Sequence, residues 1–272
     1  MPELPEVETL VLEFQKKLTG QTVSSVSVFR KTRVFKVSAE VLQKGLPGKR
    51  IEKVGRRGKF LVFHLSRGFS LTFHLGMTGR LVWAADAGSE DPHLHLGLRF
   101  EGIPGQLFFR DVRRFGGIYF WAEGEPAPAG IRRLGEDALK ISAAEFKKIF
   151  RSRRGRIKSL LLNQTLISGL GNIYADESLF RSGMDPRRRP FRIPGAKLEI
   201  LHGAVREVLK EAIRSGGSSI DDYVRSDGSS GGFQKRHRVY GKAGRACGAC
   251  GTVIRRIVLG GRSSFFCSKC QQ

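Results

Sequence analysis

Apolar positions follow two different periods in the first half of the chain. Over residues 5–18 they recur at helical intervals, with Pro5 suited to a first helical turn and Gly20 following the last turn. The side chains on this face are Val7, Leu10, Val11, Phe14 and Leu18. The pattern predicts one amphipathic helix close to the N-terminus.

Between residues 22 and 121 the apolar residues come instead in short, partly alternating runs, rich in β-branched and aromatic side chains and punctuated by Gly and Pro. These runs predict strands at residues 23–28, 60–65, 69–75, 93–100, 106–109 and 117–121, with a turn at 55–59. Short strands of this kind are typical of a β-sandwich or barrel.

The helical period returns after a stretch rich in Pro and Gly at residues 123–130. Ser142 and Glu145 make a capping-box signature, and further helices are expected at residues 157–162, 172–180 and 198–213. Residues 216–232 are rich in Gly, Ser and Asp. A loop of that length in a compact domain is a candidate functional loop.

Four cysteines near the C-terminus follow the pattern C-x2-C, sixteen residues, C-x2-C. They are Cys247, Cys250, Cys267 and Cys270. The spacing favours one structural Zn²⁺ over a redox pair or free thiols, and four thiolates would close its coordination shell. Strands are expected at 253–259 and 263–266, joined across Gly260 and Gly261. The metal would supply the folding energy that so few apolar residues cannot.

Together these patterns predict an α+β protein with two domains. We expect a helix and a β-sandwich or barrel at residues 1–125, a linker at 126–140, a helical domain at 141–236 and a zinc finger at 237–272.

Charge narrows the class of partner. The chain has 272 residues, with 48 Lys and Arg against 25 Asp and Glu, and a formal net charge of +23. Such an excess points to a polyanion, with nucleic acid favoured over an anionic membrane surface because no basic amphipathic helix is evident. No apolar run is long enough to span a membrane, and the acidic N-terminus is unlike a signal peptide. We therefore expect a soluble protein of the cytoplasm. The six histidines form no metal-binding spacing, so residue patterns alone stop at a zinc-containing nucleic-acid binder.

Several motifs together carry the interpretation further. The chain opens Pro2-Glu-Leu-Pro-Glu-Val-Glu-Thr9 and contains the following segments in order: Gly58-Lys59, His74-Leu-Gly-Met77, Asp111-Val-Arg-Arg-Phe-Gly116, Gly169-Leu-Gly-Asn-Ile-Tyr-Ala-Asp-Glu177 and Ser226-Asp-Gly228. With the four-cysteine hairpin, this arrangement resembles the formamidopyrimidine-DNA glycosylase family over essentially the whole chain.

The resemblance implies a bifunctional DNA glycosylase and AP lyase of base excision repair. Its substrate would be double-stranded DNA containing oxidised purines such as 8-oxoguanine and formamidopyrimidines. Removal of Met1 would free the secondary amine of Pro2 to attack sugar C1′ and form an iminium, after which β,δ-elimination nicks the strand. Glu3 would be the general acid/base, with Glu6 in support, and Lys59 would lie at the lesion's phosphate.

The same resemblance assigns the DNA contacts. Met77, Arg113 and Phe115 would fill the gap left by the flipped base. His74, Asn172 and Arg262 would grip phosphates, and Lys158 would lie near the catalytic glutamate and contact DNA. Ser218, Ser219 and Tyr223, in the loop at 216–232, are candidates to cap the lesion. The helical domain would be a helix–two-turn–helix, and the enzyme a monomer.

Two alternatives remain open at this point. An endonuclease VIII-type enzyme shares the architecture and acts on oxidised pyrimidines, although Leu4 favours the formamidopyrimidine branch. A catalytically silent DNA-binding relative is the other alternative, against which Pro2, Glu3 and Lys59 argue.

Overall fold

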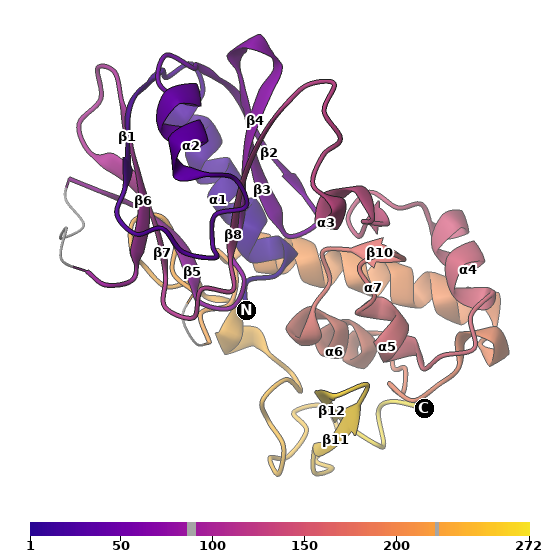
Figure 1. The fold of residues 1–272 in the computed structure, drawn as a ribbon. Coiled ribbons are helices and arrows are strands. Elements are labelled where there is room, and N and C mark those ends of the chain that lie inside the picture. Colours follow the sequence, from indigo (N-terminus) through magenta and orange to yellow (C-terminus); the bar gives the residue numbers. More distant parts are fainter. Residues whose placement is uncertain (86–90, 221–222) are drawn as a thin grey trace. The chain divides into compact units, whose positions relative to one another are not determined.

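The computed structural model describes residues 1–85, 91–220 and 223–272. It divides the chain into two compact units, Met1–Arg132 with Ser215–Gln234, and Arg133–Arg214 with Lys235–Gln272 (Figure 1). The expected α+β architecture is confirmed. One assignment differs: residues 215–234 were expected within the helical domain, whereas they pack with the N-terminal unit.

The N-terminal unit contains two four-stranded antiparallel sheets, ordered β2-β3-β4-β8 and β1-β6-β7-β5. Their strands are β1 Val23–Val28, β2 Ile51–Arg57, β3 Phe60–Leu65, β4 Phe69–His74, β5 Gly79–Ala84, β6 Leu94–Phe100, β7 Gln106–Asp111 and β8 Gly117–Ala122. All six expected strands are present. Strands β2 and β5 were not expected, and the turn predicted at 55–59 is confined to Gly58 and Lys59 because residues 55–57 extend β2.

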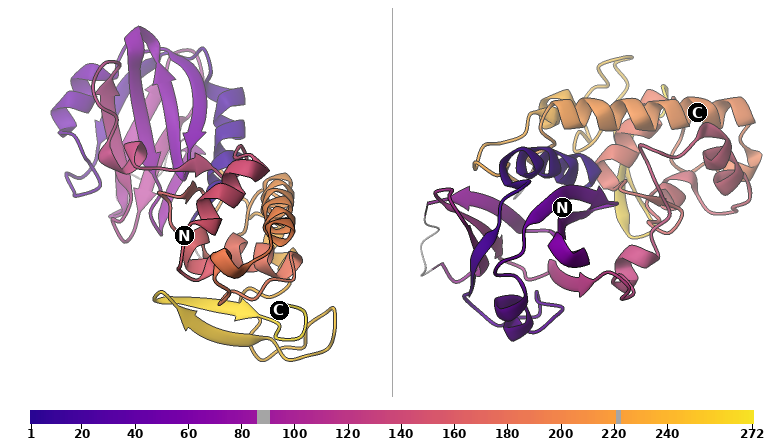
Figure 2. Two further views of the ribbon diagram at one scale, coloured as in Figure 1. Left: turned by 90° about the vertical axis from the view of Figure 1, so that its right-hand side faces the viewer. Right: turned by 90° about the horizontal axis from the view of Figure 1, so that it is seen from above.

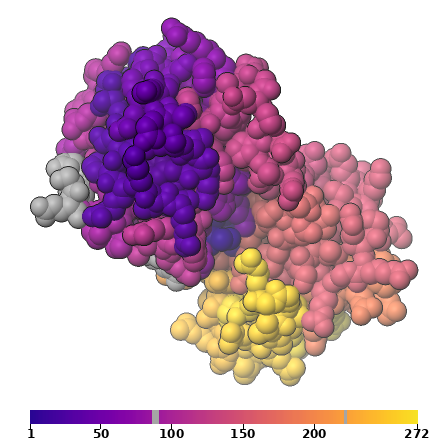
Figure 3. Space-filling view, in the orientation of Figure 1, coloured from indigo at the N-terminus to yellow at the C-terminus, as the bar shows by residue number. Residues whose placement is uncertain are grey.

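Two helices flank these sheets. Helix α1 (Leu4–Leu18) packs on β2 and β3, and α2 (Ala39–Gly45) packs beside β1. Figure 2 shows the two helices on opposite sides of the strands, and the segment around α2 forms part of the near face of this unit in Figure 3. The 3-10 turn η1 (Ser66–Gly68) joins β3 to β4, and the short helix α3 (Ala129–Arg132) ends this part of the chain.

The second unit is helical and carries the zinc-finger segment. Its helices are α4 Ala143–Arg151, α5 Ile157–Leu161, α6 Asn172–Arg181 and α7 Gly195–Arg214, with 3-10 turns η2 (Pro190–Arg192) and η3 (Phe233–Arg236, which begins in the other unit). Strands β9 (Glu136–Asp137) and β10 (Ile167–Ser168) pair in parallel, and β11 (Arg255–Leu259) pairs with β12 (Arg262–Phe266) as a hairpin. The capping box predicted at Ser142 is present. Within the described ranges, every helix is too short or too polar to cross a membrane.

The two sheets of the N-terminal unit meet through aromatic side chains. Phe73 on β4 is fully buried, and its ring lies 5.8 Å from that of Phe63 on β3 and 5.6 Å from that of Phe109 on β7. Because β7 belongs to the other sheet, Phe73 links the two layers.

Replacing this residue tests the importance of that contact. We expect Phe73→Ala to lower the free energy of unfolding of the N-terminal unit by about 3–5 kcal/mol, since it leaves a cavity between the layers. Leu12→Ala is the control: Leu12 is an exposed α1 residue, so the change should stay within about 0.5 kcal/mol. Urea denaturation followed by tryptophan fluorescence measures both variants. Equal, small effects would contradict a packed interface at Phe73.

Candidate functional site

The start of α1 is held by the buried carboxylate of Glu6. Glu3 is the N-cap of α1, and its backbone N–H donates to Glu6 Oε2 at 2.8 Å. The other oxygen, Glu6 Oε1, accepts from the backbone N–H of Ser218 at 2.7 Å. Pro2 is buried, and Glu3 and Glu6 are only 2% and 1% exposed. Glu6 therefore joins the start of the chain to a segment more than two hundred residues later.

Glycine is required where that later segment meets Glu6. Gly217 has φ +80°, and a Cβ on it would lie 2.8 Å from Glu6 Oε1. Both the positive φ and the close approach exclude a side chain without rearrangement.

The turn that carries Lys59 is tied to the same helix. Arg56 donates from Nε to Glu8 Oε2 at 2.6 Å and from Nη1 to the Gly58 carbonyl at 2.8 Å. The Arg56 side chain is 5% exposed, so this ion pair is largely shielded from water. It fixes the β2–β3 turn, and with it Lys59, against the second turn of α1.

His74, at the end of β4, is a neutral imidazole near pH 7. Burial lowers its pKa to about 4, with a further contribution from the positive charge of Lys59. Nδ1 accepts from the backbone N–H of Gly76 at 3.3 Å, and the ring packs 4.7 Å from that of Phe60. Since Nδ1 is the acceptor, Nε2 carries the hydrogen and is available as a donor.

Two loops present exposed apolar side chains. Met77 and Phe115 are 38% and 47% exposed. The buried carboxylate of Asp111 holds the loops together: it accepts from Thr78 Oγ1 at 2.5 Å and from the backbone N–H of Gly116 at 2.7 Å. The wedge residues expected from the sequence thus lie on adjacent, firmly connected loops.

Cations surround the second of these loops. Arg33 donates to the carbonyls of Arg113 and Arg114, at 3.1 and 3.0 Å. The guanidinium carbons of Arg33 and Arg113 lie 5.1 and 4.7 Å from the centre of the Phe115 ring. An open hollow of about 600 Å³ beside the loop is lined by Lys31, Thr32, Arg33, Val112, Arg113 and Arg114. A surface of this composition attracts a polyanion.

The segment predicted to cap a lesion packs within the N-terminal unit, where it contacts Glu6 of α1. Residues 221 and 222 of this loop lie outside the described residues. Tyr223 is 6% exposed within the apolar core, and its hydroxyl donates to the Glu6 carbonyl at 3.4 Å. Burial raises the pKa of this phenol. In this structure Tyr223 packs in the core beside Glu6, and its contact with a flipped base stays a prediction. Ser218 anchors the loop to Glu6, and Ser219 Oγ accepts from the Gly231 N–H at 2.8 Å.

In the second unit, Asn172 begins α6 directly after a tight turn. The N-cap residue is Gly171, which has no side chain to cap the helix. Gln164 holds the turn: its amide donates to the Leu170 carbonyl at 2.7 Å, and its oxygen accepts from the Gly169 N–H at 3.0 Å. Asn172 Oδ1 is buried without a hydrogen-bond partner. A helix N-terminus with this geometry is suited to an anion.

Lys158 differs from expectation. Its side chain is fully buried, with Nζ 2.7 Å from Asp176 Oδ1 and 2.7 Å from the Ser263 carbonyl. The other oxygen of Asp176 accepts from the Phe265 N–H at 3.0 Å. Burial raises the pKa of the Asp176 carboxyl, and the adjacent Lys158 ammonium opposes that rise. Because no part of the Lys158 side chain is exposed, it cannot reach a phosphate, and the predicted DNA contact is corrected: Lys158 and Asp176 hold β12 against α5 and α6.

The neighbouring Glu177 anchors the segment that leads into the zinc finger. Its carboxylate accepts from three successive backbone N–H groups, those of Arg238, Val239 and Tyr240, at 2.8–3.0 Å. The finger is thus held at both ends by adjacent acidic residues of α6.

The four cysteines fit a zinc ion. Their Sγ atoms all lie within 4.8 Å of one another, and no disulfide joins them. The Cys247–Cys270 and Cys250–Cys267 sulfur separations are 3.9 and 3.4 Å. Tetrahedral coordination with Zn–S bonds of about 2.3 Å requires sulfurs about 3.8 Å apart. One structural Zn²⁺ held by these thiolates would close the hairpin, on which Arg262 is exposed as the first residue of β12.

Residues that hold the site together were mostly not predicted. Asp111, Asp176 and Glu177 stand inside the motifs used for the family resemblance, so their positions were available although their roles were not. Arg33 and Arg56 carry no sequence signal, because their partners are distant in the chain.

The imidazole of His74 gives a pH prediction. Its pKa lies below the value of 6.5 in an unfolded chain, so the folded state binds fewer protons than the unfolded state. The contribution of His74 to the free energy of unfolding therefore falls as the pH decreases from about 6.5 to 4. We expect the His74 NMR signal, assigned with His74→Gln, to titrate near pH 4. The urea-unfolded chain is the control and should titrate near 6.5. A midpoint above pH 6 in the folded protein would contradict the buried neutral ring.

Zinc removal gives a second prediction. Chelation should loosen the hairpin, so that trypsin cuts at Arg255 and Arg256. The thermal transition of the N-terminal unit should be retained, because the metal binds only within the finger, which belongs to the other unit. Limited proteolysis and calorimetry measure the two effects. Chelator already saturated with zinc is the control. Loss of the whole cooperative transition would show that the metal supports more than the hairpin.

Comparisons with known proteins match every part of this architecture. Residues 1–118 match the formamidopyrimidine-DNA glycosylase N-terminal domain, residues 134–224 the H2TH domain of that enzyme, and residues 244–272 a zinc finger found in FPG and IleRS. The formamidopyrimidine-DNA glycosylase of Solibacter usitatus is 44% identical, with both chains covered completely.

Solved structures agree with the sequence relatives. A Lactococcus lactis FPG variant in complex with Fapy-dG-containing DNA has a TM-score of 0.91 and 36% identity, with both chains covered completely. Wild-type Lactococcus lactis FPG with DNA containing an oxidised pyrimidine has a TM-score of 0.90, with the same identity and coverage. With its full-length relatives, three matching domains and a four-cysteine cluster suited to zinc, this chain belongs to the formamidopyrimidine-DNA glycosylase family.

Proposed function

We propose that this chain excises oxidised purines from double-stranded DNA and then cleaves the strand at the resulting abasic site. The observation that carries the proposal is the N-terminal assembly, in which Pro2 directly precedes the buried Glu3 at the start of α1. The nucleophile would be the secondary amine of Pro2 after Met1 is removed. An α-amino group has a pKa near 7.7–8.0 in peptides, so a neutral fraction is present at pH 7.

The chemistry follows from that amine. Its nitrogen bonds to sugar C1′ as the bond between C1′ and the base breaks. The departing base takes up a proton, and the new ammonium loses the proton that the nitrogen carried. The C1′–O4′ bond then opens as Glu3 protonates O4′, leaving an iminium between C1′ and the Pro2 nitrogen. The iminium acidifies C2′. Loss of a C2′ proton expels the 3′ phosphate, and a second elimination expels the 5′ phosphate.

The exposed loops suit eviction of a base from the helix. An enzyme that acts on a base must take it out of the stack, and the cost falls when side chains fill the gap. Met77 and Phe115 are apolar and project from connected loops, as such a role requires. Arg113, stacked on Phe115, would donate to the orphaned partner base.

Phosphate contacts would come from both units. Lys59 and the Nε2 donor of His74 serve the N-terminal unit, while Asn172 at the start of α6 and Arg262 on the zinc hairpin serve the other. The net charge of +23 supplies the nonspecific part of the affinity. We infer that the enzyme acts as a monomer on the DNA of a bacterial cytoplasm.

A second substrate class has a specific observation behind it. The Lactococcus lactis relative is known in complex with DNA that contains an oxidised pyrimidine. Activity on pyrimidine lesions is therefore the alternative against which the purine preference is measured.

Borohydride trapping tests the proposal, because reduction of the iminium leaves a stable protein–DNA crosslink. We expect wild-type protein lacking Met1 to crosslink to a duplex with 8-oxoguanine opposite cytosine more efficiently than to one with an oxidised pyrimidine. Pro2→Gly, which replaces the secondary amine with a primary one, should reduce crosslinking at least about tenfold. Leu12→Ala is a matched surface control on the same helix. Preferential crosslinking to the pyrimidine duplex would assign the alternative substrate, and no crosslink to either duplex would overturn the catalytic proposal.

A further inference from the structure

The loop that carries Phe115 contains a strained residue. The loop joins β7 to β8 through residues 112–116, and Arg114 within it has φ +57°. A residue with a Cβ is uncommon in this left-handed region and persists only where its surroundings hold it there. Arg113, Arg114 and Phe115 are all exposed, so packing contributes little to holding them. Hydrogen bonds therefore have to maintain the conformation.

The ends of this loop are held through backbone N–H groups. Thr78 Oγ1 accepts from the Arg113 N–H at 2.9 Å, and Asp111 Oδ2 accepts from the Gly116 N–H at 2.7 Å. Both accepting residues are buried, so these two bonds are shielded from water. The carbonyls between the two bonds need a donor from outside the loop.

Arg33 supplies that donor through one planar group. Its Nη2 donates to the Arg113 carbonyl at 3.1 Å, and its Nε donates to the Arg114 carbonyl at 3.0 Å. A guanidinium presents its donors in a fixed fork, so binding two successive carbonyls fixes the orientation of both peptide groups. The same guanidinium lies 5.1 Å from the centre of the Phe115 ring. One side chain therefore contacts both the backbone and the ring of the loop.

The segment that carries Arg33 is attached to both strands that the loop connects. On one side, the fully buried His95 ring bridges this segment to β7, with Nδ1 3.2 Å from Thr32 Oγ1 and Nε2 3.0 Å from the Asp111 carbonyl. On the other side, the Val34 carbonyl accepts from a backbone N–H of β8 at 2.9 Å. Arg33 thus reaches the exposed loop from a fixed base.

We propose that Arg33 is a positioning residue that holds the loop at 112–116 in the conformation that presents Arg113 and Phe115 to DNA. The inference rests on the proposed function, in which these two side chains fill the gap left by a displaced base. It assigns no contact between Arg33 and the reacting nucleotide. Without the guanidinium, the Arg114 backbone would leave the left-handed region, and the competent loop would be a smaller fraction of the population.

Two substrates separate this role from a general loss of stability. A duplex with 8-oxoguanine opposite cytosine requires the gap to be filled, whereas a single strand with an abasic site has neither a base to displace nor a partner strand. In single-turnover assays at saturating protein, we expect Arg33→Met to slow excision from the duplex about tenfold, the effect of losing charge-assisted hydrogen bonds at an exposed position. Cleavage of the abasic single strand should change less than about twofold. Arg33→Lys keeps the charge but not the fork, so it should recover only part of the loss.

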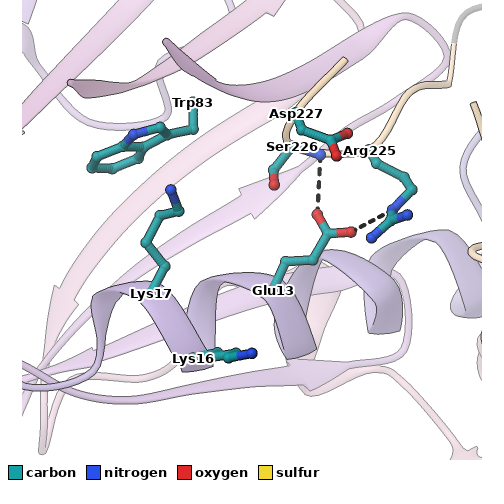
Figure 4. Close-up of a pocket in the computed structure, with 7 residues that line it drawn as sticks. All are labelled: Glu13, Lys16, Lys17, Trp83, Arg225, Ser226 and Asp227. Carbon is teal, nitrogen blue, oxygen red and sulfur yellow. Dashed lines mark hydrogen bonds and ion pairs between the residues drawn. The ribbon is translucent and has the colours of Figure 1, made fainter. Parts of the chain in front are cut away.

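Two exposed cations of the same unit are matched controls. Arg30→Met makes the same substitution three residues away, at a side chain that takes no part in the bonds to the loop described above. Lys17→Met removes a cation from an aromatic ring elsewhere in the unit, because Lys17 Nζ lies 4.6 Å from the centre of the Trp83 ring (Figure 4). Both variants should change the ratio of the two activities less than about twofold.

Trypsin reports on the loop without measuring activity. It cleaves after arginine and must take the carbonyl of the cleaved bond into its oxyanion hole. The carbonyls of Arg113 and Arg114 are the ones that Arg33 binds. Cleavage after these two residues, identified by mass spectrometry at short digestion times, should accelerate about tenfold in Arg33→Met and stay unchanged in Arg30→Met.

The combined results decide between the possible roles. A selective loss on the 8-oxoguanine duplex, together with faster cleavage of the loop, supports the positioning role of Arg33. Equal losses on both substrates, no loss on either, or a selective loss with unchanged tryptic cleavage would overturn it. If wild-type protein acts on neither substrate, the proposed function fails, and unchanged cleavage of the loop in Arg33→Met would then separately refute the attachment.

Discussion

The site is organised around the Glu6 carboxylate, which is almost completely buried. One oxygen accepts from the Glu3 N–H at the entry of α1, and the other accepts from the Ser218 N–H. A buried carboxylate is costly unless it is fully hydrogen-bonded, so both donors must stay in place while the fold is intact. The residue that follows Pro2 and the loop that begins at Gly217 are consequently fixed by the same group. Any movement of the loop relative to the N-terminus must stretch or replace one of these two bonds.

The zinc finger depends on a different kind of buried charge. Lys158 and Asp176 are a fully buried ion pair, and each also bonds to the backbone of β12. Replacing such a pair with apolar residues can preserve stability, but it would leave the Ser263 carbonyl and the Phe265 N–H without partners. We interpret the pair as fixing the register of the hairpin on α5 and α6. Zinc closes the hairpin at its cysteine end, while the pair and Glu177 determine where it is attached.

Local patterns predicted the elements well and their connections poorly. The six strands with strong apolar alternation and the capped helices were predictable, because period and capping are local properties. β2 was not, since Lys53 and Glu52 are exposed and its buried Arg56 depends on Glu8 of α1. The four cysteines could be assigned from spacing alone. The burial of Lys158 and Tyr223 could not be predicted, because a motif specifies the residue and not its burial, which depends on contacts with β12 and with the core around Glu6.

The distribution of charge between interior and surface connects these observations. Among the described residues, the buried acidic residues are Glu3, Glu6, Asp111, Asp137, Asp176, Glu177 and Asp185. The basic residues shielded from water are fewer: Lys59, Lys158 and the side chain of Arg56. Backbone N–H groups are donors, so carboxylates are the natural side chains for fixing loops and strand ends from inside. A chain that uses its few acids in this way leaves its surface still more basic than the net charge of +23 indicates. The acids that fix the loops and the zinc finger are therefore withdrawn from the surface, so that the surface that meets the phosphates of DNA is richer in basic side chains.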